Sequence, residues 1–227
     1  MSGGEFPRSP RLLKGALAVY PEQTPGTTPR LVVFQYNPEQ LRRTLVARVP
    51  ARDAANRGAA LEDTLRVQGP PVETINLSVL FNAADQLASA RGGDTVLEHG
   101  LQPELATLEL LLYPSTDQVQ EGRSQAERGQ VQVQPADLPL VLLVWGKSRV
   151  VPVKLTSFSV TEEHFDAELN PIHLKVDLAL QVLTYLELRQ STIGYDAYLS
   201  YQRQKEQLAG KAQPRAGTDR VRGLLPR

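Results

Sequence analysis

Apolar and polar residues alternate in several short stretches of this chain, which is the pattern of half-buried β-strands. In residues 72–81, VETINLSVLF, every second residue from 75 to 81 is large and apolar. Residues 172–183, IHLKVDLALQVL, repeat the pattern, with an apolar residue at every second position from 174 to 180. Each stretch predicts a strand with one face in a core and the other in water.

Further apolar runs predict more strands at residues 12–20, 31–36, 138–146 and 150–160. The run LVVFQY stops at Asn37-Pro38, because proline lacks a backbone donor and restricts the residue before it. We predict a turn there and then a third strand through Leu45 and Val49; a short helix with Asn37 as its N-cap is the alternative. Turns near residues 146–148 and 170–171 predict antiparallel pairing of the later strands.

One helix is predicted at residues 103–112, PELATLELLL, where Pro103 suits the first turn and leucines follow at helical spacing before Pro114. Two segments, 82–100 and 115–137, are predicted to be mobile loops, since the second is rich in Gln, Arg, Glu and Gly with few apolar side chains. The predicted fold class is mainly β with one or two helices, as an antiparallel β-sandwich or split barrel.

The C-terminal part differs in charge from the rest of the chain. Residues 191–227 are helical in composition, and Arg203 to Arg227 has seven basic residues against two acidic ones, a net charge of +5. Because the total charge is zero, residues 1–202 carry −5. We predict a β domain over residues 1–190 and a helical, basic extension over 191–227.

Composition excludes several classes of function. Lys and Arg, 25 together, balance 25 Asp and Glu, so no overall field attracts nucleic acid or an anionic membrane. The absence of cysteine excludes disulfides, thiolate nucleophiles and Cys-based metal sites. The N-terminus lacks the apolar core of a signal peptide, and the longest apolar run, residues 138–145, is far shorter than a membrane span. We therefore expect a soluble, cytoplasmic protein without membrane insertion.

Candidate chemistry is sparse. In the acidic stretch TEEHFDAE, His164, Asp166 and Glu168 would share one face of a strand as metal ligands, but a solvated turn explains them more simply. His99 and His173 stand alone, and the chain has no P-loop, dinucleotide fingerprint or nucleophile elbow. The sequence therefore predicts neither an enzyme nor a cofactor site.

The order of several short motifs resembles the tube-protein domain of contractile injection systems, over roughly residues 10–185. The motifs are FQYNP after the second strand, ETINLSVLFNAAD in the middle, VWG at the end of a later strand, and a final hairpin. The family usually has Asp-Gly before the hairpin proline; here Leu169-Asn170 stands there, and we expect Asn170 to supply the left-handed conformation. The positions that match the family's motifs are Phe34, Tyr36, Asn37, Pro38, Trp145, Gly146, Phe165, Asn170 and Pro171.

The resemblance implies a structural subunit with the split-barrel fold of phage-tail tubes and without an active site or a cofactor. Such a subunit forms a closed ring, expected to be hexameric, within a phage-tail-like particle assembled in the cytoplasm. Its implied partners are copies of itself, the inner tube protein, the spike or hub protein and other baseplate components. The long loops and the basic tail favour a tube-initiating or baseplate-adaptor subunit over the bulk tube protein.

Two further expectations concern aromatic side chains. A carbohydrate-binding β-sandwich that uses Trp145 and the tyrosines between 195 and 201 is the rival function, although Trp145 is more simply explained by packing at a strand end. In the tail, we predict docking on an acidic surface of a neighbouring subunit, with packing against the chain's own domain as the alternative. The predicted docking residues are Tyr195, Tyr198, Tyr201 and Arg203.

Overall fold

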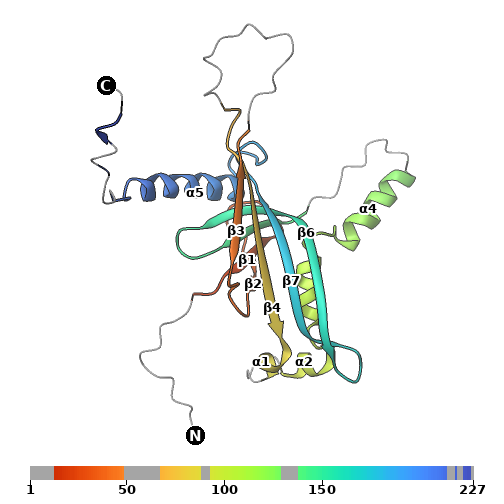
Figure 1. Cartoon of the computed structure of the whole chain (residues 1–227). Helices are drawn as coiled ribbons and strands as arrows, with labels where there is room; N and C mark the ends of the chain where they lie inside the picture. Colours follow the sequence, from red (N-terminus) through yellow and green to blue (C-terminus); the bar gives the residue numbers. More distant parts are fainter. Residues whose placement is uncertain are drawn as a thin grey trace, which may run out of the picture.

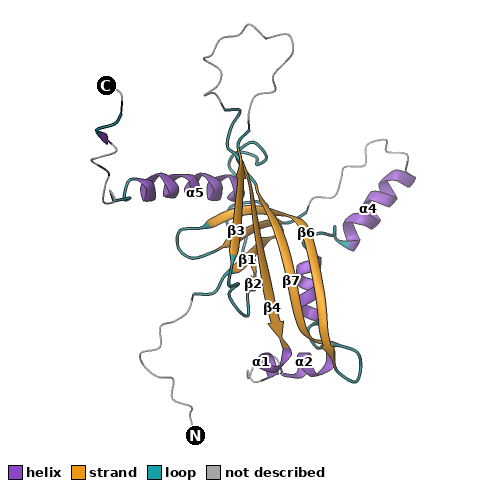
Figure 2. Cartoon of the chain, viewed as in Figure 1, coloured by secondary structure: helices purple, strands orange, loops and turns teal. Residues whose placement is uncertain are grey.

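The computed structural model describes residues 13–48, 67–87, 93–128, 138–213, 218 and 222–225. Its strands form one seven-stranded antiparallel sheet in the order β2-β1-β5-β6-β7-β4-β3 (Figures 1 and 2). The predicted mainly β fold is thereby confirmed. The strands are β1 (Ala16–Tyr20), β2 (Arg30–Val33), β3 (Leu41–Val46), β4 (Val72–Asn82), β5 (Leu140–Val144), β6 (Val150–Phe165) and β7 (Pro171–Val182).

Five helices lie among the described residues, against one or two predicted. They are α1 (Ala83–Leu87), α2 (Gly93–His99), α3 (Gln102–Glu109), α4 (Thr116–Glu127) and α5 (Ile193–Ala209). Within the described ranges no helix combines the length and the apolar character needed to cross a membrane.

The sheet curls so that the β2–β1 end approaches β4. The N–H of Phe34 donates to the carbonyl of Gly15 beside β1 (2.9 Å), while the side chain of Gln35 bonds the N–H and the carbonyl of Asn82 at the end of β4 (2.8 and 2.9 Å). In a flat sheet of this order, β1 and β4 would lie about 19 Å apart, four strand spacings. Since two adjacent residues, Phe34 and Gln35, reach both strands, the seven described strands form one curled sheet.

The inner face of this sheet holds the main core. Every second residue from 75 to 81 of β4 and from 174 to 180 of β7 is buried, which confirms the alternation predicted for both strands. Residues of β1, β5 and β6 extend the same core. A smaller cluster on the other face of β1 and β5 is covered by the start of α5; its buried members are Ala18, Leu140 and Leu142.

Helix α3 confirms the predicted helix and completes the core. Pro103 lies in its first turn, and Leu105 and Leu108 are buried against the sheet. The helix ends at Glu109, before the expected Pro114, because the backbone tightens into a turn in which the N–H of Leu112 donates to the carbonyl of Glu109 (2.8 Å).

The prediction of mobile loops at 82–100 and 115–137 is wrong for the described residues of both segments. The first contains α1 and α2, and the N–H of Ala84 is capped by the side chain of Asn82 (2.9 Å). The second contains α4, which starts with a capping box: Ser115 and Gln118 exchange side chain-to-backbone hydrogen bonds. Figure 1 shows α4 standing away from the sheet, and none of its residues is buried. Residues 129–137 lie outside the described part.

Candidate assembly surface

Residues 34–38, FQYNP, connect the two edge strands of the sheet, β2 and β3. Phe34 is fully buried in the core, and Gln35 holds the end of β4. The hydroxyl of Tyr36 donates a short hydrogen bond to Asp85 in α1, which raises the pKa of Tyr36. These three residues thus attach the connector to the core, to the end of β4 and to α1.

Asn37 explains why β2 stops so abruptly. Its side-chain oxygen accepts a hydrogen bond from the N–H of Gly15 (2.8 Å), and its side-chain nitrogen donates to the carbonyl of Leu13 (3.0 Å). The amide therefore occupies the position that the next strand residue would take beside β1. The predicted turn is confirmed, and so is the third strand up to Val46, whereas Val49 lies outside the described residues. The helix with Asn37 as its N-cap is not formed, because the Asn37 side chain bonds back to residues 13 and 15 before β1. Pro38 follows, half-buried.

Trp145 and Gly146 end β5 at the hairpin that leads to β6. The half-buried Trp145 ring packs so closely on Gly15 that a Cβ there would lie 2.7 Å from the ring. The backbone N–H of Trp145 donates to the carbonyl of Arg149 (2.7 Å). Gly146 has a φ of +74°, which glycine adopts readily. Trp145 therefore packs at the strand end, the simpler of the two interpretations.

The β6–β7 hairpin turns where the sequence predicted, and Asp166 organises the turn. Its carboxylate accepts hydrogen bonds from the N–H groups of Glu168 (3.0 Å) and Asn170 (2.8 Å) and from the Asn170 side chain (3.0 Å). The bond from the Asn170 side chain is the main cause that holds the pKa of Asp166 below its ordinary value. Phe165 pairs with Pro171 at the base of the turn.

The left-handed residue of this turn is Leu169, with a φ of 66°, so the assignment of that conformation to Asn170 is wrong. Asn170 is instead needed for its side chain, which also donates to the carbonyl of Glu98 at the end of α2 (3.2 Å). The N–H of Leu101 donates to the carbonyl of Pro171 (2.9 Å). The turn is thereby fixed both internally and against α2.

The acidic stretch before this turn remains a solvated hairpin. Glu163 lies opposite His173, and their side chains approach to 3.0 Å. His164 lies 6.3 Å from the His173 ring, measured between centroids. Among the described residues, no three His, Cys, Asp or Glu side chains are placed to hold a metal ion.

Helix α5 is attached to the sheet by the tyrosines that we predicted to face a neighbour. Tyr198 and Tyr201 are 4% and 3% exposed and belong to the main core, so they are not available for docking in this conformation. For these two residues the alternative prediction, packing against the chain's own domain, is confirmed. Tyr195 is partly exposed and Arg203 is exposed.

A buried carboxylate secures this packing. Glu73 on β4, 3% exposed, accepts a hydrogen bond from the Arg43 guanidinium on β3 (2.7 Å) and one from the Tyr201 hydroxyl (3.3 Å). Arg43 also donates to the Tyr201 hydroxyl (2.9 Å). The ammonium of Lys205 lies 4.1 Å from the Tyr201 ring centroid, and burial lowers the pKa of Lys205. These contacts join α5 to β3 and β4.

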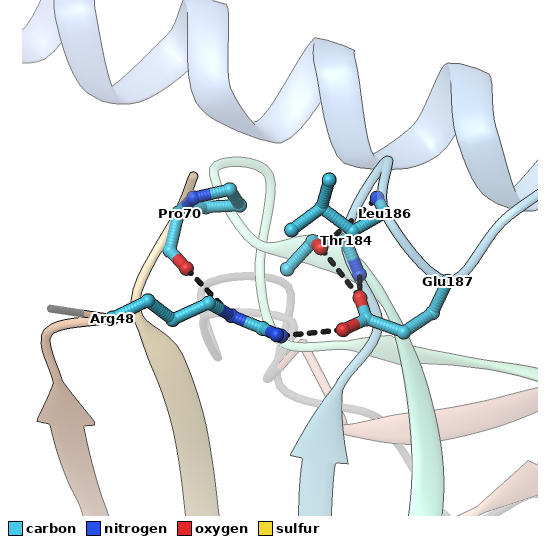
Figure 3. A network of polar contacts seen from close by, with 5 residues as sticks. All are labelled: Arg48, Pro70, Thr184, Leu186 and Glu187. Atoms are coloured by element: carbon cyan, nitrogen blue, oxygen red, sulfur yellow. Dashed lines mark hydrogen bonds and ion pairs between the residues drawn. The ribbon is translucent and has the colours of Figure 1, made fainter. Parts of the chain in front are cut away.

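A second polar network, shown in Figure 3, ties the segment between β7 and α5 to the start of β4. Arg48 donates to the carbonyl of Pro70 (3.1 Å) and forms a short ion pair with Glu187. The other carboxylate oxygen of Glu187 accepts from the N–H of Thr184 (2.8 Å) and from its hydroxyl. Burial alone would raise the pKa of Glu187, but the hydrogen bonds from Thr184 and the Arg48 charge lower it below 4.5.

This lowered pKa predicts a stability difference that depends on pH. Because the folded state holds the Glu187 carboxylate more strongly than the unfolded state, its contribution is complete above about pH 4.5 and disappears as the pH falls through the folded pKa. Glu187→Gln should therefore be less stable than the wild type at neutral pH, and the difference should vanish in acid. Urea unfolding of both proteins across this range measures it, with the exposed Glu39→Gln as control. A difference independent of pH would contradict the prediction.

The candidate assembly surface is a long edge of β6 that no described strand pairs. Strand β5 pairs with β6 only over Val150–Val153, whereas β7 follows β6 from Val153 to Phe165. On the side away from β7, residues 154–165 face no other described strand. Most of these residues are exposed. The backbone N–H and carbonyl groups on that side, which no described strand pairs, can add a further strand.

No protein-family model matches this chain, and no curated protein matches it significantly.

Proposed function

We propose that this chain is a ring-forming structural subunit of a contractile injection system, and that the ring connects the inner tube to the spike and baseplate. The order of the motifs in the sequence suggests this role. Their positions support it, since Asn37, Trp145, Gly146 and Asn170 all lie where strands end or turn. These residues set strand lengths and registers, which a shared sheet requires.

The unpaired edge of β6 is the observation that carries this proposal. Monomeric proteins generally protect such edges with charge, proline or a covering segment, because an open edge pairs with other strands. The edge of residues 154–165 is long, and β6 extends there past the end of β5 with β7 on its other side (Figure 1). A neighbouring copy that adds a strand here would cover it.

Strand β3 offers a complementary edge for that neighbour. It pairs only with β4 and lies at the end of the sheet. It carries the exposed residues Arg42, Leu45 and Val46, whereas the β6 edge ends in Glu162 and Glu163. Pairing of β6 with β3 joins two different surfaces, and such head-to-tail contacts generate rings when the rotation closes. The resemblance suggests six copies.

The outer face of the sheet is suited to water and not to a tight partner. A shallow groove of about 350 Å³ crosses β3, β4, β7 and β6 there. Small or polar side chains line most of it, among them Asn76, Ser78, Ser157, Ser159 and Asp177. In a ring built through the strand edges, this face would line the channel or the outer wall.

A pair of proline substitutions tests the edge. Adjacent strand residues point their N–H groups to opposite sides, so one of Ser159 and Val160 donates toward β7 and the other toward the free edge. Ser159→Pro and Val160→Pro should therefore differ: the variant that loses a bond to β7 is destabilised, and the other keeps its thermal transition. We expect the stable variant to remain monomeric where the wild-type chain forms closed rings in mass photometry and electron microscopy.

Asp117→Pro at the start of α4 is a control for the substitution itself, because proline is tolerated in a first helical turn and no residue of α4 is buried. It should form rings as the wild type does. A wild-type chain that stays monomeric at high concentration, or a folded proline variant that still forms complete rings, would overturn the proposal.

A further inference from the structure

The turn between β6 and β7 carries concentrated negative charge. The stretch from residue 155 to 174 contains no Lys or Arg. Its carboxylates lie around the turn, and Glu98 of α2 lies next to it, because the Glu98 carbonyl accepts the bond from Asn170. The name acidic tip is used below for five residues of this surface: Glu98, Glu162, Glu163, Asp166 and Glu168.

Exposed apolar side chains accompany these charges. Leu169 is 77% exposed and Phe165 is 51% exposed. Leu169 also has the left-handed backbone conformation, which costs an L-residue about 1 kcal/mol or more. The hydrogen bonds of Asp166 and Asn170 hold the turn in place, so Leu169 is presented on a rigid support. A rigid apolar residue ringed by charge is well suited to a partner of opposite charge.

The C-terminal tail has the complementary chemistry. After Gly210, the C-cap of α5, residues 211–227 contain five basic residues and one acidic residue, a net charge of +4. Leu224 and Leu225 within this tail are 83% and 62% exposed. The tail therefore combines positive charge with apolar side chains, as the acidic tip combines negative charge with apolar side chains.

We propose that the C-terminal tail of one copy docks on the acidic tip of a neighbouring copy. The inference rests on the proposed ring, which supplies the neighbour. Figure 1 shows α5 at the opposite end of the sheet from the β6–β7 turn. The free stretch of β6, residues 154–165, alone spans about 40 Å, roughly two thirds of the ~60 Å that 17 fully extended residues can reach, so the tail would have to be largely extended to reach its own tip. A neighbouring tip avoids that entropic cost.

Cross-linking between marked copies tests the contact, and the absence of native cysteine makes it clean. One full-length chain carries Ala167→Cys in the tip and a second carries Gly223→Cys in the tail. When the two variants are mixed and treated with a short bismaleimide, they should form a dimer cross-linked between tip and tail. Each variant treated alone should give a lower yield of cross-linked dimer. Raising the salt from 0.05 to about 0.5 M should reduce the yield by about tenfold, because screening weakens exposed charge pairs.

Charge reversal supplies the specificity test. Glu168→Lys in the tip chain should lower the yield by about tenfold, and Arg220→Glu in the tail chain should restore part of it. Glu127→Lys, the same change on the exposed end of α4, is the control and should have no effect.

Three results would overturn the inference. In a chain with both cysteines, a link formed within one monomer would show that the tail docks on its own tip. Complete rings without any cross-link between tip and tail would contradict the proposed tail contact and would be consistent with the proposed ring. A chain that forms no oligomer would contradict both the tail contact and the ring.

Discussion

Tyr198→Ala is expected to lower the free energy of unfolding by about 3–5 kcal/mol, the usual range for removing a buried aromatic side chain. Tyr198 is 4% exposed, lies in the main core and contacts the Tyr185 ring edge-on at 6.1 Å between centroids. Its removal leaves a cavity between α5 and the sheet that neighbouring side chains cannot fill. Urea unfolding at neutral pH measures the loss.

The same argument predicts that truncation after Thr192 destabilises the β domain, because it exposes the surface that Tyr198 and Tyr201 cover. The control is Leu208→Ala on the same helix, where Leu208 is 49% exposed; we expect a change below about 0.5 kcal/mol. A truncated chain with the thermal transition of the full chain would contradict the role given to α5. In that case α5 would be a detachable extension.

Glu73→Ala is expected to cost about 3 kcal/mol, since removing one partner of a buried ion pair leaves the other uncompensated. The substitution leaves the Arg43 guanidinium without its carboxylate and removes an acceptor from the Tyr201 hydroxyl. Arg43 is partly exposed, and its side chain can turn to water, which places the loss at the lower end of the measured range.

A double-mutant cycle separates the pair from its parts. Glu73→Leu combined with Arg43→Met should be clearly more stable than the sum of the two single changes, because neither charge is then left unpaired. Glu206→Ala on the exposed side of α5 is the control and should be close to neutral. Additive effects of Glu73→Leu and Arg43→Met would show that the two side chains are not coupled.

The local sequence pattern was sufficient to predict a strand or helix whose buried residues recur at the regular spacing of that element. The strands β4 and β7 were predicted from alternation alone, because one face of each lies in the core along its length. Helix α3 was predicted for the same reason, from leucines at helical spacing. The end of β2 was also predicted, since Asn37-Pro38 prevents continuation whatever its surroundings.

Other local signals were present in the sequence and were outweighed by composition. Ser115 and Gln118 have the spacing of a capping box, yet the polar composition of residues 115–137 favoured a loop over α4. Glu73 lies two positions before Ile75, so its side chain falls on the apolar face of β4. A carboxylate at such a position requires a partner, but alternation does not say which residue supplies it.

The sequence alone determined the strand segments, the turns and the charge contrast between body and tail, because these depend on residues close together in the chain. The tertiary structure decided which distant groups meet. It showed that Arg43 and Tyr201 donate hydrogen bonds to Glu73 and that Tyr198 and Tyr201 of α5 pack in the chain's own core. It also showed that β5 stops pairing at Val153 and leaves the β6 edge open. Such contacts depend on how the sheet curls and on the order of its strands, and a periodic pattern along one segment contains neither.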